Sequence, residues 1–295
     1  MTFVAAPRRA VISVHYYPEY LKSSVARALD LCARVGATRC VVVANQPALS
    51  TALTSAFVGR GLDADVVVHD NSGLEFGAYQ AGLDRLFRAS EPDWTIVIND
   101  TYARHECYSS PMRRKFMSAV TTTDDVETPI AVGPIDSLPR SYTLLGARSH
   151  RWIRSNAFAL NRGALRALDW RLRCVEVDAL VRGGTDEGTF LADDLDEILA
   201  HHLRSFLFHP DACPSWYRAA ALDAGNAAAF ARKACSILQE KYLSARLDAV
   251  SAIFIDTKPV FDSERLAHRL DATAFQIGQR YRSYGGRSAA STSAK

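Results

Sequence analysis

The stretch from Val66 to Tyr102, VVVHDNSGLEFGAYQAGLDRLFRASEPDWTIVINDTY, constrains the fold more than any other part of the chain. It begins with a short apolar run, Val66 to Val68, and a second run follows from Trp94 to Ile98. Between them, Gly77 to Ser90 carries apolar side chains at the spacing of a helix. A strand, a helix and a strand in this order predict a βαβ unit of a parallel sheet.

Further apolar runs extend this unit on both sides. Ala10 to Val14 and Cys40 to Ala44 precede it as strands, each followed by a helix. These runs are too continuous for a sheet with one wet face, so they predict a doubly wound, mostly parallel α/β sheet. The later elements are predicted in this order: a helix at Met112–Val120, a strand at Ile130–Val132, a loop at Pro134–Ser149, a strand at Trp152–Leu160, a helix at Gly163–Leu168 capped by Asn161, a helix from Asp186 to Leu203, a strand at Phe206–Phe208, a long helix around Phe230–Tyr242 and a last helix at Ser263–Arg282.

Length and composition are those of a globular enzyme, with 295 residues, 48% of them hydrophobic and 23% charged. We expect a domain from 1 to 218, a helical C-terminal addition from 219 to 284 and a disordered tail from 285 to 295. The net charge of +3 is too small to predict a nucleic-acid partner. The six cysteines are dispersed and no long apolar run is present, which predicts a cytoplasmic protein without a membrane span.

Both strands of the opening unit end in polar residues, His69-Asp70-Asn71 and Asn99-Asp100-Thr101. In open α/β sheets ligands bind beyond the carboxyl ends of the strands. We therefore expect the two clusters to leave neighbouring strands at one edge of the sheet and to converge on one ligand. Asp100 could hold Mg²⁺ or Mn²⁺ against a diphosphate, since magnesium takes one or two carboxylates plus phosphate oxygens. The alternative is that Asp100 only caps a turn.

The segment from Asp70 to Gly77 predicts a nucleotide or donor-sugar pocket. Gly73 and Gly77 let the backbone approach a ligand or adopt positive φ. Asp70, Asn71 and Glu75 offer hydrogen-bonding groups to sugar or ribose hydroxyls. The alternative is a plain helix N-terminus, at which the helix dipole favours Glu75.

These motifs carry a family resemblance. HDNSGLEFGAYQAGL followed by VINDTY, with VISVHYY upstream and WIRSNAFALNRGAL downstream, resembles the bacterial rhamnan-synthesis F proteins and related glycosyltransferases. The matches run in order from about His15 to about Trp170. The resemblance implies a GT-A-type nucleotide-sugar fold and sugar transfer in surface-polysaccharide assembly. It places His15 and Tyr16 near the nucleotide, and puts Asn99-Asp100 where the usual Asp-x-Asp metal motif stands.

An inverting sugar transferase also needs a carboxylate base. Asp186 and Glu187 follow a glycine turn and are the candidates, although both also suit the first turn of a helix. His209 could ligate the metal or be structural. Acceptor hydroxyls could meet Ser155 and Asn156, with Trp152 stacking on a sugar ring, or this segment could be an ordinary core strand.

We therefore expect a glycosyltransferase with a nucleotide-sugar donor and a glycan or lipid-linked glycan acceptor. Arg113-Arg114-Lys115 and the basic last helix, with Arg265, Arg269, Arg280 and Arg282, could hold it at the inner face of a membrane. The alternative is that these residues form ordinary solvated faces. One alternative is a non-catalytic nucleotide- or glycan-binding protein, because only one carboxylate stands at Asn99-Asp100. The other is a methyltransferase, disfavoured because His15-Tyr16-Tyr17-Pro18 replaces a glycine-rich loop after the first strand.

Overall fold

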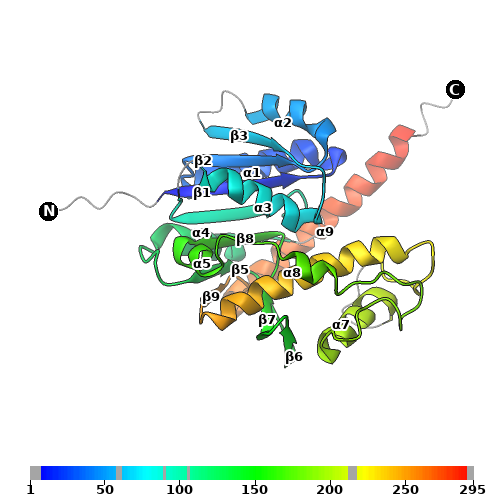
Figure 1. The fold of residues 1–295 in the computed structure, drawn as a ribbon. Coiled ribbons are helices and arrows are strands. Elements are labelled where there is room, and N and C mark those ends of the chain that lie inside the picture. The colour runs from blue at the N-terminus through cyan, green and yellow to red at the C-terminus, as the bar shows by residue number, and fades with distance from the viewer. Residues whose placement is uncertain (1–7, 58–61, 89–90, 105–106, 212–217, 291–295) are drawn as a thin grey trace.

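The computed structural model describes residues 8–57, 62–88, 91–104, 107–211 and 218–290, with side chains as far as residue 278. At its centre is a seven-stranded sheet of mixed direction (Figure 1). Its strands lie in the order β3 (Asp63–Val68), β2 (Arg39–Ala44), β1 (Arg9–His15), β4 (Trp94–Asn99), β8 (Ala157–Asn161), β5 (Ile130–Gly133) and β9 (Ile253–Asp256). The first four are parallel, β8 runs antiparallel to both neighbours, and β9 is parallel to β5. The predicted α/β sheet, mostly parallel, is confirmed.

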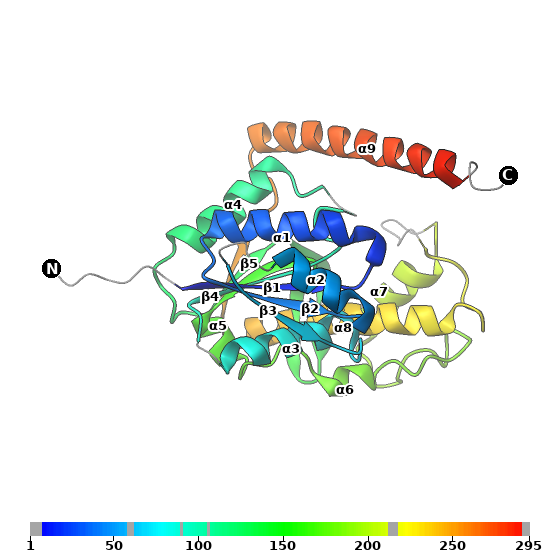
Figure 2. The ribbon, with the colours of Figure 1, turned by 90° about the horizontal axis from the view of Figure 1, so that it is seen from above.

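Helices cover both faces of this sheet (Figure 2). One face packs against α1 (Leu21–Val35), α2 (Ser50–Phe57) and α4 (Ser110–Thr122), and the other against α3 (Leu74–Phe87), α5 (Arg162–Ala167) and α8 (Ala227–Ala249). Successive strand residues point to opposite faces, so Val11 joins the first core and Ile12 the second. Burial on both sides is the reason that these strands are continuous apolar runs. Short 3-10 turns, Pro18–Tyr20 and Pro47–Leu49, precede α1 and α2.

A smaller third core lies beside the sheet. It joins the hairpin of β6 (Ile135–Leu144) and β7 (Ala147–Ile153) to α6 (Val175–Asp178), α7 (Glu197–Phe208) and one side of α8. The prediction of a loop at 134–149 was wrong, because this segment is the hairpin. Its register shifts between Ser137 and Tyr142, which hides the alternation of buried and exposed residues that marks a regular strand.

Three other boundaries differ from the prediction. The predicted strand at 152–160 is the end of β7 plus β8, with a break between them. The helix expected from Asp186 begins only at Glu197, because Asp196 caps it by accepting hydrogen bonds from the amides of Ile198 and Leu199. The run 206–208 is the last turn of that helix and not a strand. The predicted cap at Asn161 is confirmed, since its side chain accepts from the Ala164 amide at 2.9 Å.

The C-terminal part supplies β9, which the sequence did not reveal, and α9 (Asp262–Ala290). Residues 219–284 are therefore not only helical, because β9 pairs with β5 in the central sheet. Residues 285–290 of the predicted disordered tail continue α9, and 291–295 lie outside the described residues. The domain boundaries proposed at 218 and 284 stay a prediction.

Candidate functional site at the carboxyl ends of the central strands

The strand order reverses next to β1. The chain moves from β1 to β2 and β3 on one side, then crosses back to place β4 on the other side of β1. In open α/β sheets such a reversal opens a crevice at the carboxyl ends, and ligands bind there. The carboxyl end of β1 leads into Tyr16-Tyr17, and that of β4 leads into Asp100.

Asp100 bridges this reversal point. Its Oδ2 accepts hydrogen bonds from the amides of Tyr16, at 2.8 Å, and Tyr17, at 2.7 Å. Its Oδ1 has no hydrogen-bond partner among the described residues. The alternative that Asp100 caps the turn that follows it was wrong, because the segment that it caps follows β1 and not β4. Two backbone amides thus hold Oδ2 of this carboxylate in place.

The surroundings of Asp100 hold its proton more tightly than water would. The residue is 3% exposed. Burial raises the pKa of Asp100 to about 6, and the negative charge of Glu75 adds to this increase, while the two amide hydrogen bonds oppose it. A carboxyl group with a pKa near neutrality is what general acid–base chemistry requires, and it is costly to keep ionised without a cation nearby.

A hydrogen-bonded network extends from Asp100's neighbour Asn99 toward α3 and α8. The side-chain amide of Asn99 donates to the Tyr79 hydroxyl at 2.9 Å, and that hydroxyl donates to the backbone carbonyl of Ser155 at 2.8 Å. The Ser155 hydroxyl donates to Glu75 Oε1 at 3.1 Å, and the Ser155 amide donates to Glu240 Oε2 at 2.6 Å. We call Glu75, Asn99, Asp100 and Ser155, together with Tyr79 and Glu240, the rim cluster.

Sequence reasoning missed two members of the rim cluster. Tyr79 was assigned only to the apolar face of a helix, and Glu240 lies within a long helix that carries no motif. Burial raises the pKa of Glu240, and burial also raises that of Tyr79 well above its usual value, with Glu75, Asp100 and Glu240 adding to the effect. No local signal could have identified Glu240, because its partner Ser155 is 85 residues away.

The ring of His15 is buried. One ring nitrogen pairs with Ser13 Oγ and the other with Ser24 Oγ, both at 2.9 Å. Burial lowers the pKa of His15 to about 4, so the ring is neutral at physiological pH. Its predicted place next to a nucleotide is untested, but both ring nitrogens are engaged. Tyr16, the other residue implied there, is only partly buried and gives its amide to Asp100.

The Asp70 loop lies at the same edge of the sheet as Asp100, but the expectation of neighbouring strands was wrong. Strands β2 and β1 separate β3 from β4, about 14 Å at the usual strand spacing. Asp70 is exposed and accepts from the Ser72 amide at 2.9 Å. Glu75, at the start of α3, is the residue after this loop whose negative charge raises the pKa of Asp100.

The backbone conformation and packing of this loop explain why glycine stands at positions 73 and 77. Gly73 has φ +67°, and Asn71, which pairs with Asn45, has φ +64°. A Cβ at Gly77 would collide with the Ser72 carbonyl oxygen. These positions therefore need glycine or asparagine for the turn itself, whether or not a ligand approaches.

The proposed base and the histidine lie together, without contact to Asp100. Asp186 caps its own turn, accepting from the amides of Gly188 and Thr189 at 3.0 Å, and the Thr189 hydroxyl bond holds its pKa below the usual range. Glu187 Oε2 lies 3.6 Å from His209 Nε2. Within the described ranges, no three His, Cys, Asp or Glu side chains gather in a metal-binding group. A divalent ion at Asp100 would thus depend on Oδ1, water and ligand phosphates.

Of the three predicted acceptor residues, Ser155 belongs to the rim cluster and Trp152 does not. The Trp152 ring is buried under the ammonium of Lys241, 3.1 Å from the ring centroid, and beside His202. Burial lowers the pKa of Lys241 to about 7. The backbone amide of Asn99 donates to the backbone carbonyl of Asn156 at 3.3 Å. The side-chain Oδ1 of Asn156 is buried with no partner in the described part of the chain.

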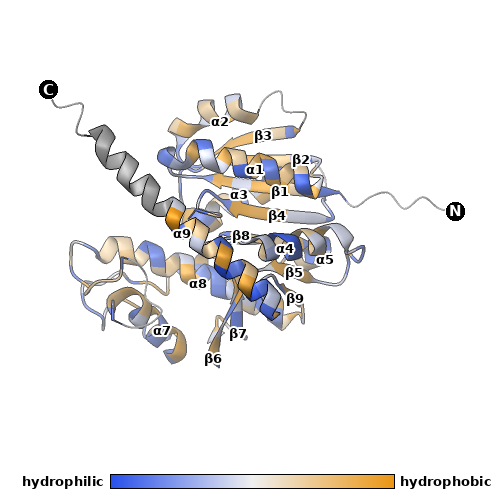
Figure 3. Ribbon diagram, turned by 180° about the vertical axis from the view of Figure 1, so that it is seen from behind, coloured by the Kyte–Doolittle hydropathy of each residue, from blue (hydrophilic) through white to orange (hydrophobic). Residues whose placement is uncertain are grey.

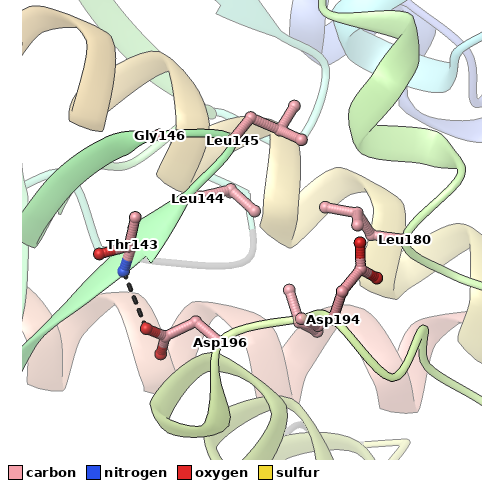
Figure 4. Close-up of a pocket in the computed structure, with 8 residues that line it drawn as sticks. Thr143, Leu144, Leu145, Gly146, Leu180, Asp194 and Asp196 are labelled. Carbon is pink, nitrogen blue, oxygen red and sulfur yellow. Dashed lines mark hydrogen bonds between the residues drawn. The ribbon is translucent and has the colours of Figure 1, made fainter.

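A separate cavity of about 350 Å³ lies in the third core (Figure 4). Its walls are the turn of the β6–β7 hairpin, Leu180, and the segment Asp194–Asp196 before α7. Asp196 Oδ2 accepts from the Thr143 amide at 3.0 Å across its edge. None of the residues predicted for the functional site lines it.

Neither a protein-family model nor a curated protein matches this chain. Among solved structures, it is similar to one described as a glucose-1-phosphate thymidylyltransferase from Bacillus anthracis in complex with a sucrose. That structure is 10% identical with a TM-score of 0.36, over 55% of this chain and 74% of that one. A 4-diphosphocytidyl-2C-methyl-D-erythritol synthase is 17% identical with a TM-score of 0.34, over 55% and 79%. Similarities this low do not assign a function.

Proposed function

We propose that this chain is a glycosyltransferase that moves a sugar from a nucleoside-diphosphate donor to a glycan acceptor of the bacterial surface. The observation that carries the proposal is the carboxylate of Asp100, buried at the reversal point of the sheet. Two amides hold its Oδ2, and its Oδ1 has no hydrogen-bond partner among the residues that the structure describes. The resemblance of HDNSGLEFGAYQAGL and VINDTY to sugar-transferring enzymes supports the same assignment.

In this proposal Asp100 would hold a divalent ion through Oδ1, and the ion would hold the diphosphate. When bound, the ion would neutralise the charge that develops as the nucleoside diphosphate leaves. A cation would also relieve the burial penalty that raises the pKa of Asp100. The amides of Tyr16 and Tyr17 fix the orientation of the carboxylate, so this chain supplies the positioning and the ligand supplies the remaining oxygen donors.

The donor sugar and the acceptor would lie along the rim cluster. Glu75 and Ser155 are already hydrogen-bonded to one another and can exchange that bond for sugar hydroxyls. Asp70 would reach only the distal part of an elongated ligand, since two strands intervene.

Glu187 and Glu75 are the two candidates for the base that deprotonates the acceptor hydroxyl. Glu187 is more available than Asp186, because the Asp186 carboxylate is occupied by its own turn. Glu75 is the alternative on geometric grounds, because it lies in the rim cluster. Exchange of each for Gln separates them: the base variant should lose turnover while still binding donor, and the other should retain turnover.

The experiment is a panel of nucleotide-sugars, tested by thermal shift with and without Mn²⁺ and then for donor hydrolysis and transfer. A specific donor stabilises the fold by mass action. Asp100→Ala should abolish turnover and metal-dependent stabilisation. Asp63→Asn is the matched control, because Asp63 is exposed at the opposite, amino end of β3.

The second candidate is a nucleotide- or glycan-binding protein without catalysis. The single carboxylate at Asn99-Asp100 and the capping role of Asp100 favour it. A donor that stabilises the protein without turnover under any metal condition would establish this alternative and refute sugar transfer. Failure of every nucleotide-sugar to bind would refute sugar transfer and nucleotide binding, and would leave only a glycan as ligand of the second candidate.

A further inference from the structure

Helix α9 packs on the body of the protein with its polar side. Glu264 forms an ion pair with Lys115 at 2.9 Å, and His268 Nδ1 pairs with Ser109 Oγ at 2.9 Å. One turn further, Asp271 accepts from the Ser110 amide at 2.6 Å. Positions 264, 268 and 271 follow one another by four and three residues, so they form one face of the helix, and that face meets α4.

Three large apolar residues of α9 lie on the opposite side and face solvent, whereas Phe275 follows Asp271 by four residues on the packed side and is partly buried. Leu266, Leu270 and Ile277 are 59%, 65% and 49% exposed, and the spacing of four and seven residues aligns them in one stripe. Just before the helix, Val260 and Phe261 are also exposed. A helix that only covered a core would present this stripe inward, so its outward direction indicates a partner surface. Figure 3 shows hydrophobic and hydrophilic residues next to one another along the side of α9 turned away from the sheet.

The charges of α9 are divided in the same way. Arg265 and Arg269 lie on the exposed side next to the apolar stripe. The carboxylates of Glu264 and Asp271 are directed toward α4. Asp262, at the first position of the helix, is the carboxylate nearest the exposed arginines, 3.6 Å from Arg265. The outward face is therefore apolar and cationic.

We propose that this outward face of α9 binds the anionic surface of a lipid bilayer, with the helix lying in the plane of the interface. Apolar side chains would enter the boundary between headgroups and acyl chains, while the arginines meet lipid phosphates. A second copy of the chain fits less well, because it would bring the same arginines to the seam and add like-charge repulsion. None of the helices in the described ranges has the length and apolar character to cross a membrane, so α9 lies on the bilayer and does not span it.

The test is flotation of the full chain with lipid vesicles. Vesicles of phosphatidylcholine with roughly 30% phosphatidylglycerol should carry the protein, and phosphatidylcholine alone should carry much less. Leu270→Glu should weaken partitioning at least tenfold. Arg265→Gln combined with Arg269→Gln should weaken it roughly thirtyfold on anionic vesicles, at about 1 kcal/mol per basic residue.

Val175→Glu is the matched control, because Val175 on α6 is 65% exposed, as Leu270 is, and lies far along the chain from α9. This variant should float like the wild type. Failure of the wild type to float with anionic vesicles overturns the proposal, as does equal partitioning to both vesicle types. A stable dimer in sedimentation that dissociates in Leu270→Glu would also overturn it, by assigning the face to a second copy. None of these measurements requires a sugar donor, so they test membrane binding independently of sugar transfer.

Discussion

Replacing Asp100 by Asn should stabilise the folded protein at neutral pH. The side chain is buried, and the pKa of its carboxyl group rises from the usual 3.8 to about 6. At 1.36 kcal/mol per pH unit, ionised Asp100 costs the folded state about 3 kcal/mol relative to the unfolded chain. Asn has the shape of the protonated acid, and its carbonyl oxygen can accept both the Tyr16 and the Tyr17 amide.

The sign of the pH dependence follows from this raised pKa. Between about pH 4 and 6 the folded state binds more protons than the unfolded state, so the contribution of Asp100 to stability is present below pH 3.8 and is lost as the pH rises through 6. The variant should therefore exceed the wild type by about 3 kcal/mol at pH 7.5 and by less than about 1 kcal/mol at pH 4.

Urea unfolding followed by tryptophan fluorescence at the two pH values measures both differences. Groups that titrate in both proteins cancel when the variant is compared with the wild type at each pH. Asp63→Asn, at an exposed position, should change stability little at either pH. An Asp100→Asn variant that is less stable than the wild type at pH 7.5, or a gain that does not shrink at pH 4, would refute the reasoning. A variant that is more stable but inactive is the pattern expected of a functional group kept at a cost in stability.

Three further predictions concern stability. The ring of His15 is buried and neutral, and its pKa of about 4 in the folded state lies below the usual 6.5. The free energy of unfolding of the wild type should therefore fall by up to about 3 kcal/mol as the pH falls from 6.5 to 4. His15→Phe should remove this pH dependence in urea unfolding. Gly77→Ala should destabilise the protein by about 2 kcal/mol or more, since the new methyl group collides with the Ser72 carbonyl, whereas Gly188→Ala should be mild, as a thermal melt can establish. Asp196→Ala should cost about 2 kcal/mol in urea unfolding, because it removes the cap of α7 and a bond to β6.

The elements around Val66–Tyr102 were predictable from the sequence because their cause is local. Apolar runs such as Cys40 to Ala44 are continuous only when both faces of a strand are covered, and the cap at Asn161 acts three residues away. The hairpin of β6 and β7 was not predictable, because its register shift breaks the alternation that signals a strand. The helix expected at Asp186 failed for a related reason, since Asp186 and Asp196 both look like caps, and only Asp196 starts a helix.

The sequence alone determined the kind of sheet and the edge at which Asp70, Asn99 and Asp100 emerge. Local periodicity identifies the strands and helices, and their alternation predicts parallel strands whose carboxyl ends lie at one edge. The tertiary structure decided which of them meet. It placed two strands between Asp70 and Asp100, and it brought Glu75, Glu240 and Ser155 to the rim cluster from two helices and the turn between β7 and β8. It also turned the apolar stripe of α9 outward. Such contacts depend on strand order and on which helix face packs against another element. They join residues that are tens of positions apart in the sequence, so no local sequence pattern predicts them.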